Sequence, residues 1–334
     1  MTESGHAFWT ALQARERELF AMPMRERMEA LNELLSPSFS DLAAEVEGNA
    51  EDERFTLVLT AHGVVEQFEA LLALVRSKPV LPRIDIVAFR RRTGKGFGMR
   101  MDDFELASED VLLRHSADQG QVALDIGFAK PIPMDMRDHA RHMAFILLDH
   151  LLGEYDFAVK VGRVDFVEGE EAEGFEGLPL DDFAAVFDDF WRNELGHTGV
   201  FESGEGRWTL ITGTHEVDGE EIPFAAQRND SANSLVGRAD LGHCLSVSVA
   251  VPSKQDLERA RAFEDQLSAS LHRPEQGCRS IVLLEAEVRT VTFYVSDAPQ
   301  ALARAKAIAQ DMDFEADFEL EFDPAWDNYG RWLD

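Results

Sequence analysis

The sequence predicts an α+β protein built as two tandem two-layer sheet-and-helix domains, residues 1–170 and 178–334. Two periods of apolar residues alternate along the chain, one typical of helices and one typical of strands. The 334 residues suit two domains, and 45% of them are hydrophobic, so both domains can bury a core. Residues 168–177 (EGEEAEGFEG) lack an apolar period and are rich in glutamate and glycine, which predicts a linker.

The elements of the first domain follow the period of the apolar residues. Helical spacing up to Pro37 predicts two N-terminal helices. We then expect strands at 42–47, 55–60 and 84–89, a helix at 64–77, a hairpin of strands 111–115 and 121–128, a long helix at 135–152 that ends before Gly153, and a strand at 157–167. From residue 55 onward this order is an elaborated two-layer α+β pattern.

The second domain follows a helix predicted at 180–195. We expect strands at 208–214, 222–228 and 241–251, a helix capped by Ser253, a hairpin of strands 281–287 and 289–295, a helix that starts at Asp297, and a last strand at 311–323. The final six elements have the order β-α-β-β-α-β. The C-terminal domain is therefore predicted to be ferredoxin-like.

The formal net charge of −31, from 32 basic and 63 acidic residues, limits the classes of partner. Nucleic acids and anionic membranes are bound through lysine and arginine, and a surface this acidic repels both. We therefore expect a protein partner with a basic surface, no nucleic-acid partner and no membrane partner.

Cysteine use and the missing targeting signals predict a bacterial-type cytoplasmic protein. The two cysteines, Cys244 and Cys278, imply no disulfide framework. The first residues, MTESGHAFW, lack the basic region and apolar core of a signal peptide. No apolar run reaches the roughly 18 residues of a membrane span.

The clearest local pattern is the acidic segment 311–323, D-M-D-F-E-A-D-F-E-L-E-F-D. In a strand, its seven acids share one side, about 6.6 Å apart, and its apolar residues share the other. Like charges this close repel one another. The acidic side is thus a solvated outer face, a docking face for a basic partner or a divalent-cation site, although no calcium-binding loop motif is present. The predicted partner-binding residues are Asp313, Glu315, Asp317, Glu319, Glu321, Trp326 and Tyr329.

The last two of these belong to an aromatic tail in which Trp326, Tyr329 and Trp332 follow i, i+3 spacing. One interpretation is a short helix that covers the core. The other is an anchor for a partner, because tryptophan and tyrosine dominate binding hot spots.

Six basic residues and one acid lie between Arg83 and Arg100, within an otherwise acidic chain. The glycine-rich part, RTGKGFG, lacks the spacing of a phosphate-binding loop. The basic residues either pair with the acidic excess or bind an anionic ligand or an acidic protein segment. The candidate anion-binding residues are Arg90, Arg91, Arg92 and Lys95.

The predicted helix at 135–152 carries His139 and His142, whose i, i+3 spacing places them on one face. A polar helix face explains them, and a metal site would need a third ligand that the sequence does not indicate. Cys244 lies in a predicted strand and is interpreted as a packed residue, not a nucleophile. The sequence therefore predicts no catalytic residue, no metal site and no cofactor.

The segment from about Trp208 to Leu333 carries a set of residues with a familiar layout. They are Glu264-Asp265, Phe293-Tyr294-Val295 and the terminal pattern Asp323-Pro324-x-Trp326-x-x-Tyr329. With them the segment resembles a bacterial family known as domain of unknown function six-nine-five, and it is similar to the regulator of ribonuclease E activity B proteins. The resemblance implies a small acidic α+β domain that binds a protein without catalysis.

The leading hypothesis is a non-enzymatic binding or regulatory protein whose acidic face meets a basic partner. One alternative is a metal-dependent hydrolase that uses acids with His139 or His142. Another is an immunity-type protein that neutralises a basic toxin by charge complementarity.

Overall fold

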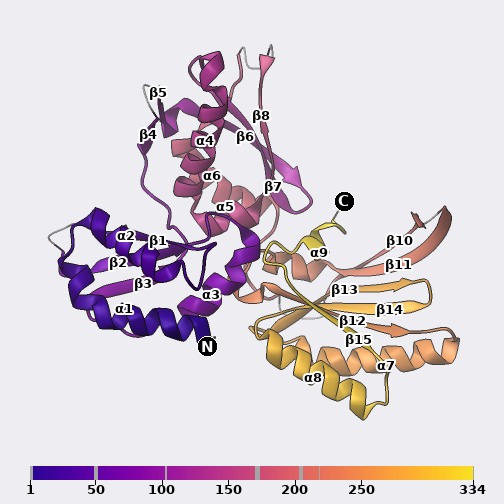
Figure 1. Cartoon of the computed structure of the whole chain (residues 1–334). Helices are drawn as coiled ribbons and strands as arrows, with labels where there is room; N and C mark the ends of the chain where they lie inside the picture. Colours follow the sequence, from indigo (N-terminus) through magenta and orange to yellow (C-terminus); the bar gives the residue numbers. More distant parts are fainter. Residues whose placement is uncertain are drawn as a thin grey trace. The chain divides into compact units, whose positions relative to one another are not determined.

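The computed structural model describes residues 3–48, 52–101, 104–169, 174–202, 206–217 and 219–333. The protein is α+β, as predicted, and its elements are drawn in Figure 1. It divides into unit 1, Met1–Ser116 with Ala123–Phe187, and unit 2, Ala117–Val122 with Asp188–Asp334. The two units differ from the predicted domains 1–170 and 178–334, because the segment after the acidic linker packs into unit 1.

The first part of unit 1 is a three-stranded sheet with helices. Its elements are α1 (Glu3–Ala21), α2 (Met24–Leu35), β1 (Ala43–Glu47), β2 (Phe55–Thr60), α3 (Phe68–Arg76) and β3 (Ile84–Ala88). β1 is antiparallel to β2, whereas β2 and β3 are parallel and are joined by a crossover through α3. The C-terminal ends of β2 and β3 therefore lie at the same edge of the sheet.

The second part of unit 1 holds a four-stranded sheet of order β8-β7-β6-β9. Its elements are β4 (Gly98–Met101), β5 (Phe104–Ala107), β6 (Val111–Asp118), β7 (Gln121–Phe128), α4 (Arg137–Leu152), α5 (Glu154–Lys160), β8 (Val161–Phe166), β9 (Leu178–Pro179) and α6 (Leu180–Asp189). Phe183 and Phe187 of α6 are buried, and Phe183 contacts the ring of His115. These contacts place α6 in unit 1 and not at the start of a second domain.

The predicted strand at 157–167 is wrong in its first part. Helix α5 occupies residues up to Lys160, and β8 begins only at Val161. The alternating apolar residues Phe157, Val159 and Val161 imitate a strand. Gly153, at a φ of 83°, ends α4 and lets the chain enter a second helix at once. The short hairpin of β4 and β5 lies in a segment for which the sequence predicts no element.

Unit 2 is a six-stranded antiparallel sheet of order β10-β11-β13-β14-β12-β15. Its elements are β10 (Trp208–Val217), β11 (Glu220–Asn229), β12 (His243–Ala250), α7 (Lys254–Leu271), β13 (Gly277–Glu285), β14 (Val288–Val295), α8 (Ala298–Asp311), β15 (Asp317–Phe322) and α9 (Asp327–Gly330). Helices α7 and α8 cover one face of the sheet (Figure 1). The ferredoxin-like arrangement stays a prediction, since this sheet has six strands.

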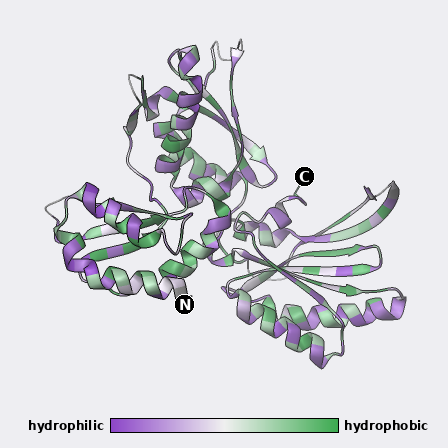
Figure 2. Ribbon diagram, in the orientation of Figure 1, coloured by the Kyte–Doolittle hydropathy of each residue, from purple (hydrophilic) through white to green (hydrophobic). Residues whose placement is uncertain are grey.

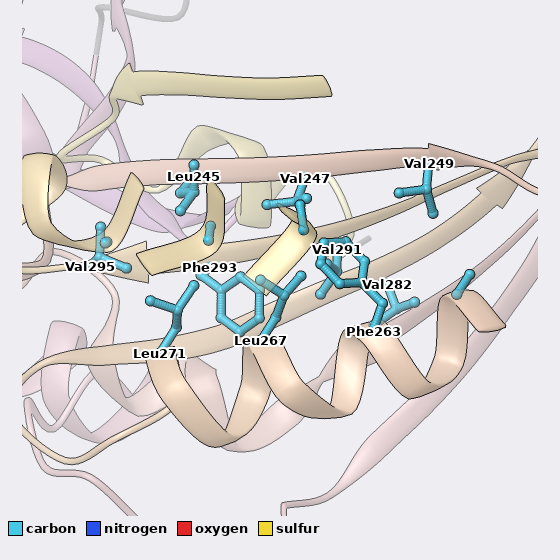
Figure 3. Packing of buried hydrophobic residues seen from close by; sticks show 14 of the residues in the cluster. Leu245, Val247, Val249, Phe263, Leu267, Leu271, Val282, Val291, Phe293 and Val295 are labelled. Atoms are coloured by element: carbon cyan, nitrogen blue, oxygen red, sulfur yellow. The ribbon is translucent and has the colours of Figure 1, made fainter. Parts of the chain in front are cut away.

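The core of unit 2 lies between that face and the two helices. Phe263 and Leu267 of α7 pack against Val247, Val291 and Phe293 of the central strands, and all of these are buried (Figure 3). Both helices also carry hydrophilic residues (Figure 2), which suits helices with one covered side.

The predicted N-terminal caps of both helices are present. The Ser253 hydroxyl accepts the backbone N–H of Asp256 at 3.2 Å, and the Asp297 carboxylate accepts that of Gln300 at 3.0 Å. Local sequence therefore determines where α7 and α8 begin.

The last strand is shorter than the predicted range 311–323. Helix α8 continues to Asp311, and β15 starts only at Asp317. Between them the chain turns at Asp313, where φ is 53°, and Phe314 stacks on Phe263 of α7 with ring centroids 4.9 Å apart. This core contact makes residues 312–316 a connection and not part of the strand.

Candidate functional site

The acidic residues predicted to bind a partner are exposed along and before β15. They are Asp313, Glu315, Asp317, Glu319 and Glu321. Within the described part of the chain, no basic side chain forms an ion pair with any of the five. Among the strands in the described ranges, β15 is hydrogen-bonded to β12 alone, so it is an edge strand. Phe318 packs against the core on the helix side, so the acids of the strand face the other way.

The acid at the end of the pattern is different. Asp323 is buried, and its carboxylate accepts the hydroxyl of Tyr294 at 2.6 Å and the backbone N–H groups of Asp327 and Asn328 at 2.8 and 3.0 Å. It holds α9 in place, so it does not belong to the exposed row.

The prediction of Trp326 and Tyr329 as partner anchors is corrected by their burial. The Trp326 ring stacks on Tyr294 at a centroid distance of 3.7 Å, and its Nε1 donates to the Leu241 carbonyl at 3.0 Å. The Tyr329 hydroxyl donates to the Asn229 carbonyl at 3.0 Å. Both side chains complete the core of unit 2, which agrees with the other interpretation of the aromatic tail.

The four basic residues proposed to bind an anion do not form one site. Arg92 pairs with Asp156 and donates to the Leu152 carbonyl, and Lys95 pairs with Asp182. Arg90 pairs with two carboxylates, and Arg91 is exposed. Three of the four cations therefore pair with acids of unit 1, as the other interpretation of the basic residues expects, and the anion site stays a prediction.

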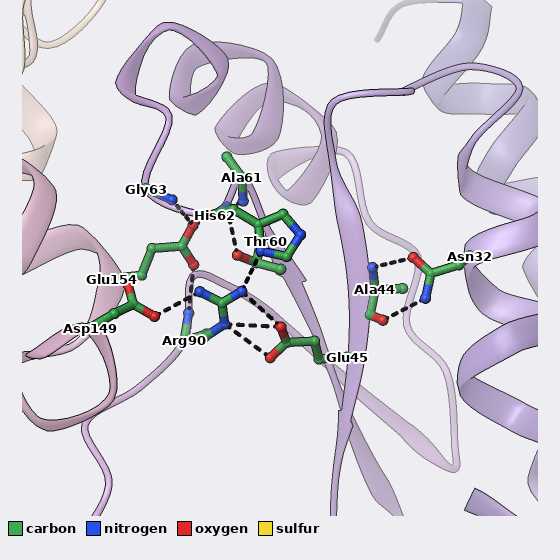
Figure 4. A network of polar contacts seen from close by, with 10 residues as sticks. All are labelled: Asn32, Ala44, Glu45, Thr60, Ala61, His62, Gly63, Arg90, Asp149 and Glu154. Atoms are coloured by element: carbon green, nitrogen blue, oxygen red, sulfur yellow. Dashed lines mark hydrogen bonds and ion pairs between the residues drawn. The ribbon is translucent and has the colours of Figure 1, made fainter. Parts of the chain in front are cut away.

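Arg90 is instead the centre of a polar network at the shared edge of β2 and β3 (Figure 4). Its Nε donates to Glu45 of β1 at 2.9 Å, its Nη1 to Asp149 of α4 at 2.6 Å, and its Nη2 to Nδ1 of His62 at 2.5 Å. Because a guanidinium only donates, Nδ1 of His62 is the acceptor and the ring proton lies on Nε2.

Glu154 binds the backbone at the ends of β2 and β3, which carry His62 and Arg90. It is fully buried, and its Oε1 accepts the backbone N–H groups of Ala61 and Gly63 at 2.9 and 3.1 Å. Its Oε2 accepts the backbone N–H of Arg90 at 3.0 Å. His62 has a φ of 52°, a left-handed conformation that is uncommon for a residue with a side chain. The carboxylate thus secures the two strand ends that carry His62 and Arg90.

The network forms one wall of a cavity of about 740 Å³ within unit 1. The polar lining residues are Glu45, His62, Arg90, His142, Asp149 and His150. The apolar lining residues are Phe145, Ile146, Phe157, Ala158, Val161 and Val164. Ligand pockets commonly measure about 300–1,000 Å³ and combine an apolar wall with a few convergent polar groups.

Electrostatics inside the cavity favour the pairing of Arg90 with the acids. Burial lowers the pKa of Arg90, but Glu45 and Asp149 outweigh it and raise that pKa above its ordinary value. Burial raises the pKa of Asp149, and the neighbouring Arg90 only partly opposes this. Titratable groups with shifted pKa values in a cleft are a sign of a functional site.

His139 and His142 of α4 have different surroundings in the structure. His142 lines the cavity, whereas His139 is exposed and is not among the lining residues. In the ranges that the structure describes, no three His, Cys, Asp or Glu side chains are grouped so as to hold a metal ion. Cys244 is buried, and burial raises the pKa of its thiol to about 12, which suits the predicted packing role.

Sequence reasoning missed the cavity because its residues come from separate segments. The one local signal was Ala61-His62-Gly63 directly after a predicted strand, since a glycine there permits a sharp turn. Glu45 and Glu154 carried no signal among so many acids.

Family models, curated proteins and solved structures were compared with this chain, and none of them matches it. The resemblance of residues 208–333 to the family of unknown function therefore stays a prediction. None of the helices in the described ranges combines the length and the apolar character needed to cross a membrane.

Proposed function

We propose that this protein is a non-enzymatic binding protein that engages a basic, extended protein segment along the edge of β15. One observation carries the proposal. Acids stand exposed at every second position from Asp313 to Glu321, and no cation in the described part of the chain pairs with them. The formal charge of −31 adds a long-range attraction for basic partners.

The edge position of β15 supports an extended partner. One side of an edge strand has unpaired backbone N–H and C=O groups, which can pair with an added strand. Side chains of an added strand lie about 4.5–5.5 Å from their cross-strand neighbours. Lysine or arginine at every second position would therefore meet Asp317, Glu319 and Glu321. Leu320, which is exposed, offers an apolar contact in the same strand.

The two buried aromatic residues play no direct part in this binding. Trp326 and Tyr329 hold α9 against the sheet and support the far end of β15 through Asp323. The proposed surface consists of the five exposed acids and Leu320.

A peptide titration tests the proposal. A short peptide with lysine and threonine in strict alternation is compared with a peptide of the same composition whose lysines are consecutive. We expect the alternating peptide to bind more tightly, with an affinity that falls as salt rises, because exposed ion pairs are screened. A non-electrostatic interaction would show little salt dependence.

Matched variants locate the binding. D317N/E319Q removes two charges from β15, and E258Q/D265N removes the same two types of charge from the exposed side of α7. At about 0.2–1 kcal/mol for each exposed pair, the β15 variant should weaken binding about 2- to 30-fold. The proposal fails if both variants weaken binding equally or if the two peptides bind alike.

Two further properties belong to this proposal. We infer that β12 to β15 with α7 and α8 form a ferredoxin-like core extended by the β10–β11 hairpin, which is supported by the element order and by the strand order β13-β14-β12-β15. We also infer a cytoplasmic location, which is supported by two free, buried cysteines.

A further inference from the structure

We infer that the cavity of unit 1 binds a small organic cation, a protonated amine carried on an apolar body. The proposal is separate from the function proposed for β15, since every lining residue belongs to unit 1. Its volume of about 740 Å³ suits an organic molecule and far exceeds a bare metal ion.

The charges of the polar lining residues determine which sign of charge the cavity favours in a ligand. Glu45 and Asp149 face a single guanidinium, that of Arg90, so the wall has one negative charge in excess when the histidines are neutral. Each of the three Arg90 nitrogens already has an acceptor. An anion would therefore meet two carboxylates and a guanidinium that is already occupied.

One oxygen of the wall is available to a donor. Asp149 uses Oδ2 to accept from Arg90, and no donor in the described ranges reaches its Oδ1. The side chain is only 11% exposed, so that oxygen lies in a site of low dielectric constant. The oxygen is accessible from the cavity, and an ammonium group would supply it with a donor of complementary charge.

The apolar lining residues suit an apolar or aromatic body. Phe145 and Phe157 lie with ring centroids 6.1 Å apart, beside Val161 and Val164. Phe145 remains 38% exposed although it is large and apolar. Aromatic faces also attract cations, so the polar and the apolar lining residues favour the same class of ligand.

The test uses phenethylamine as the probe, with 2-phenylethanol as its neutral match and phenylacetate as its anionic match. Binding is measured by calorimetry and located by the imidazole NMR signals of His62, His142 and His150. We expect saturable binding of the amine that moves these three signals. The alcohol keeps an O–H donor but lacks the positive charge, so it should bind about tenfold more weakly.

Two variants test the polar and the apolar lining residues separately. D149N should weaken amine binding about tenfold or more by removing the charged acceptor. F145A should weaken the amine and the alcohol alike and leaves the charged network intact. M28A is its matched control, because Met28 in α2 is equally exposed at 39% and does not line the cavity.

Three outcomes would overturn the inference. They are no saturable binding of phenethylamine at millimolar concentration, equal affinity for amine and alcohol, and binding that is unchanged in F145A. Because F145A does not touch the buried charges, the test stands even if D149N disturbs the fold.

Discussion

Changing Glu154→Gln should destabilise unit 1 by about 2–4 kcal/mol. The carboxylate is fully buried and accepts three backbone N–H groups, those of Ala61, Gly63 and Arg90, at 2.9–3.1 Å. A glutamine amide of the same shape has one acceptor oxygen. In its best orientation that oxygen keeps the hydrogen bonds from the N–H groups of Ala61 and Gly63. The amide NH₂, which is a donor, then faces the N–H of Arg90 and leaves it without an acceptor.

The magnitude follows from these contacts. A buried N–H left without an acceptor costs about 1–3 kcal/mol. The two remaining hydrogen bonds change from charged to neutral acceptors, which weakens each by roughly 0.5 kcal/mol or more. Removing a buried charge offsets part of this loss. The total is a large fraction of the roughly 5–15 kcal/mol by which a domain is stable.

Urea unfolding with 5-fluorotryptophan labelling measures the effect. Trp9 is the tryptophan of unit 1, and the other four lie in unit 2, so the ¹⁹F signal of Trp9 reports on unit 1 directly. At a slope of about 2 kcal/mol/M, its midpoint should fall by roughly 1–2 M. E66Q, which changes an exposed glutamate near the same strand end, is the control. A midpoint that moves no more in E154Q than in E66Q would refute this account of the network.

Three other predictions concern unit 2. Gly277→Ala should lower the free energy of unfolding, measured in urea, by about 2 kcal/mol, because the added Cβ would lie 2.6 Å from the backbone carbonyl oxygen of Leu271. A variant as stable as the wild type would contradict this prediction. Cys244 and Cys278, each with a pKa raised by burial to about 12, should react with a thiol reagent at pH 8 only as fast as the unit opens, and rapid labelling of the native protein would be the contrary result. Burial lowers the pKa of His272, whose Nδ1 accepts the backbone N–H of Arg279. The contribution of neutral His272 to the free energy of unfolding should therefore be complete above about pH 6.5 and decline as the pH falls through the lowered pKa. H272N should flatten this pH dependence, and an unchanged slope in the variant would contradict the prediction.

The sequence by itself determined most of the helices, strands and caps. The alternation of Leu245, Val247 and Val249 against serines predicted β12, and Ser253 and Asp297 predicted the starts of α7 and α8. These features depend on residues close together in the chain, so period and capping chemistry are sufficient to find them.

Only the tertiary structure decided which polar groups meet and which apolar ones are exposed. Arg90 looked like part of a basic island, but acids from β1 and α4 neutralise it. Trp326 looked like a possible anchor, but Tyr294 from a distant strand covers its ring. The contacts of Arg90 with Glu45 and Asp149 span 45 and 59 residues of the chain, and the contact of Trp326 with Tyr294 spans 32. In a chain with 63 acids, no local pattern shows which carboxylate will reach which cation. Pairing and burial are long-range consequences of packing, whereas period and caps are local properties of the chain.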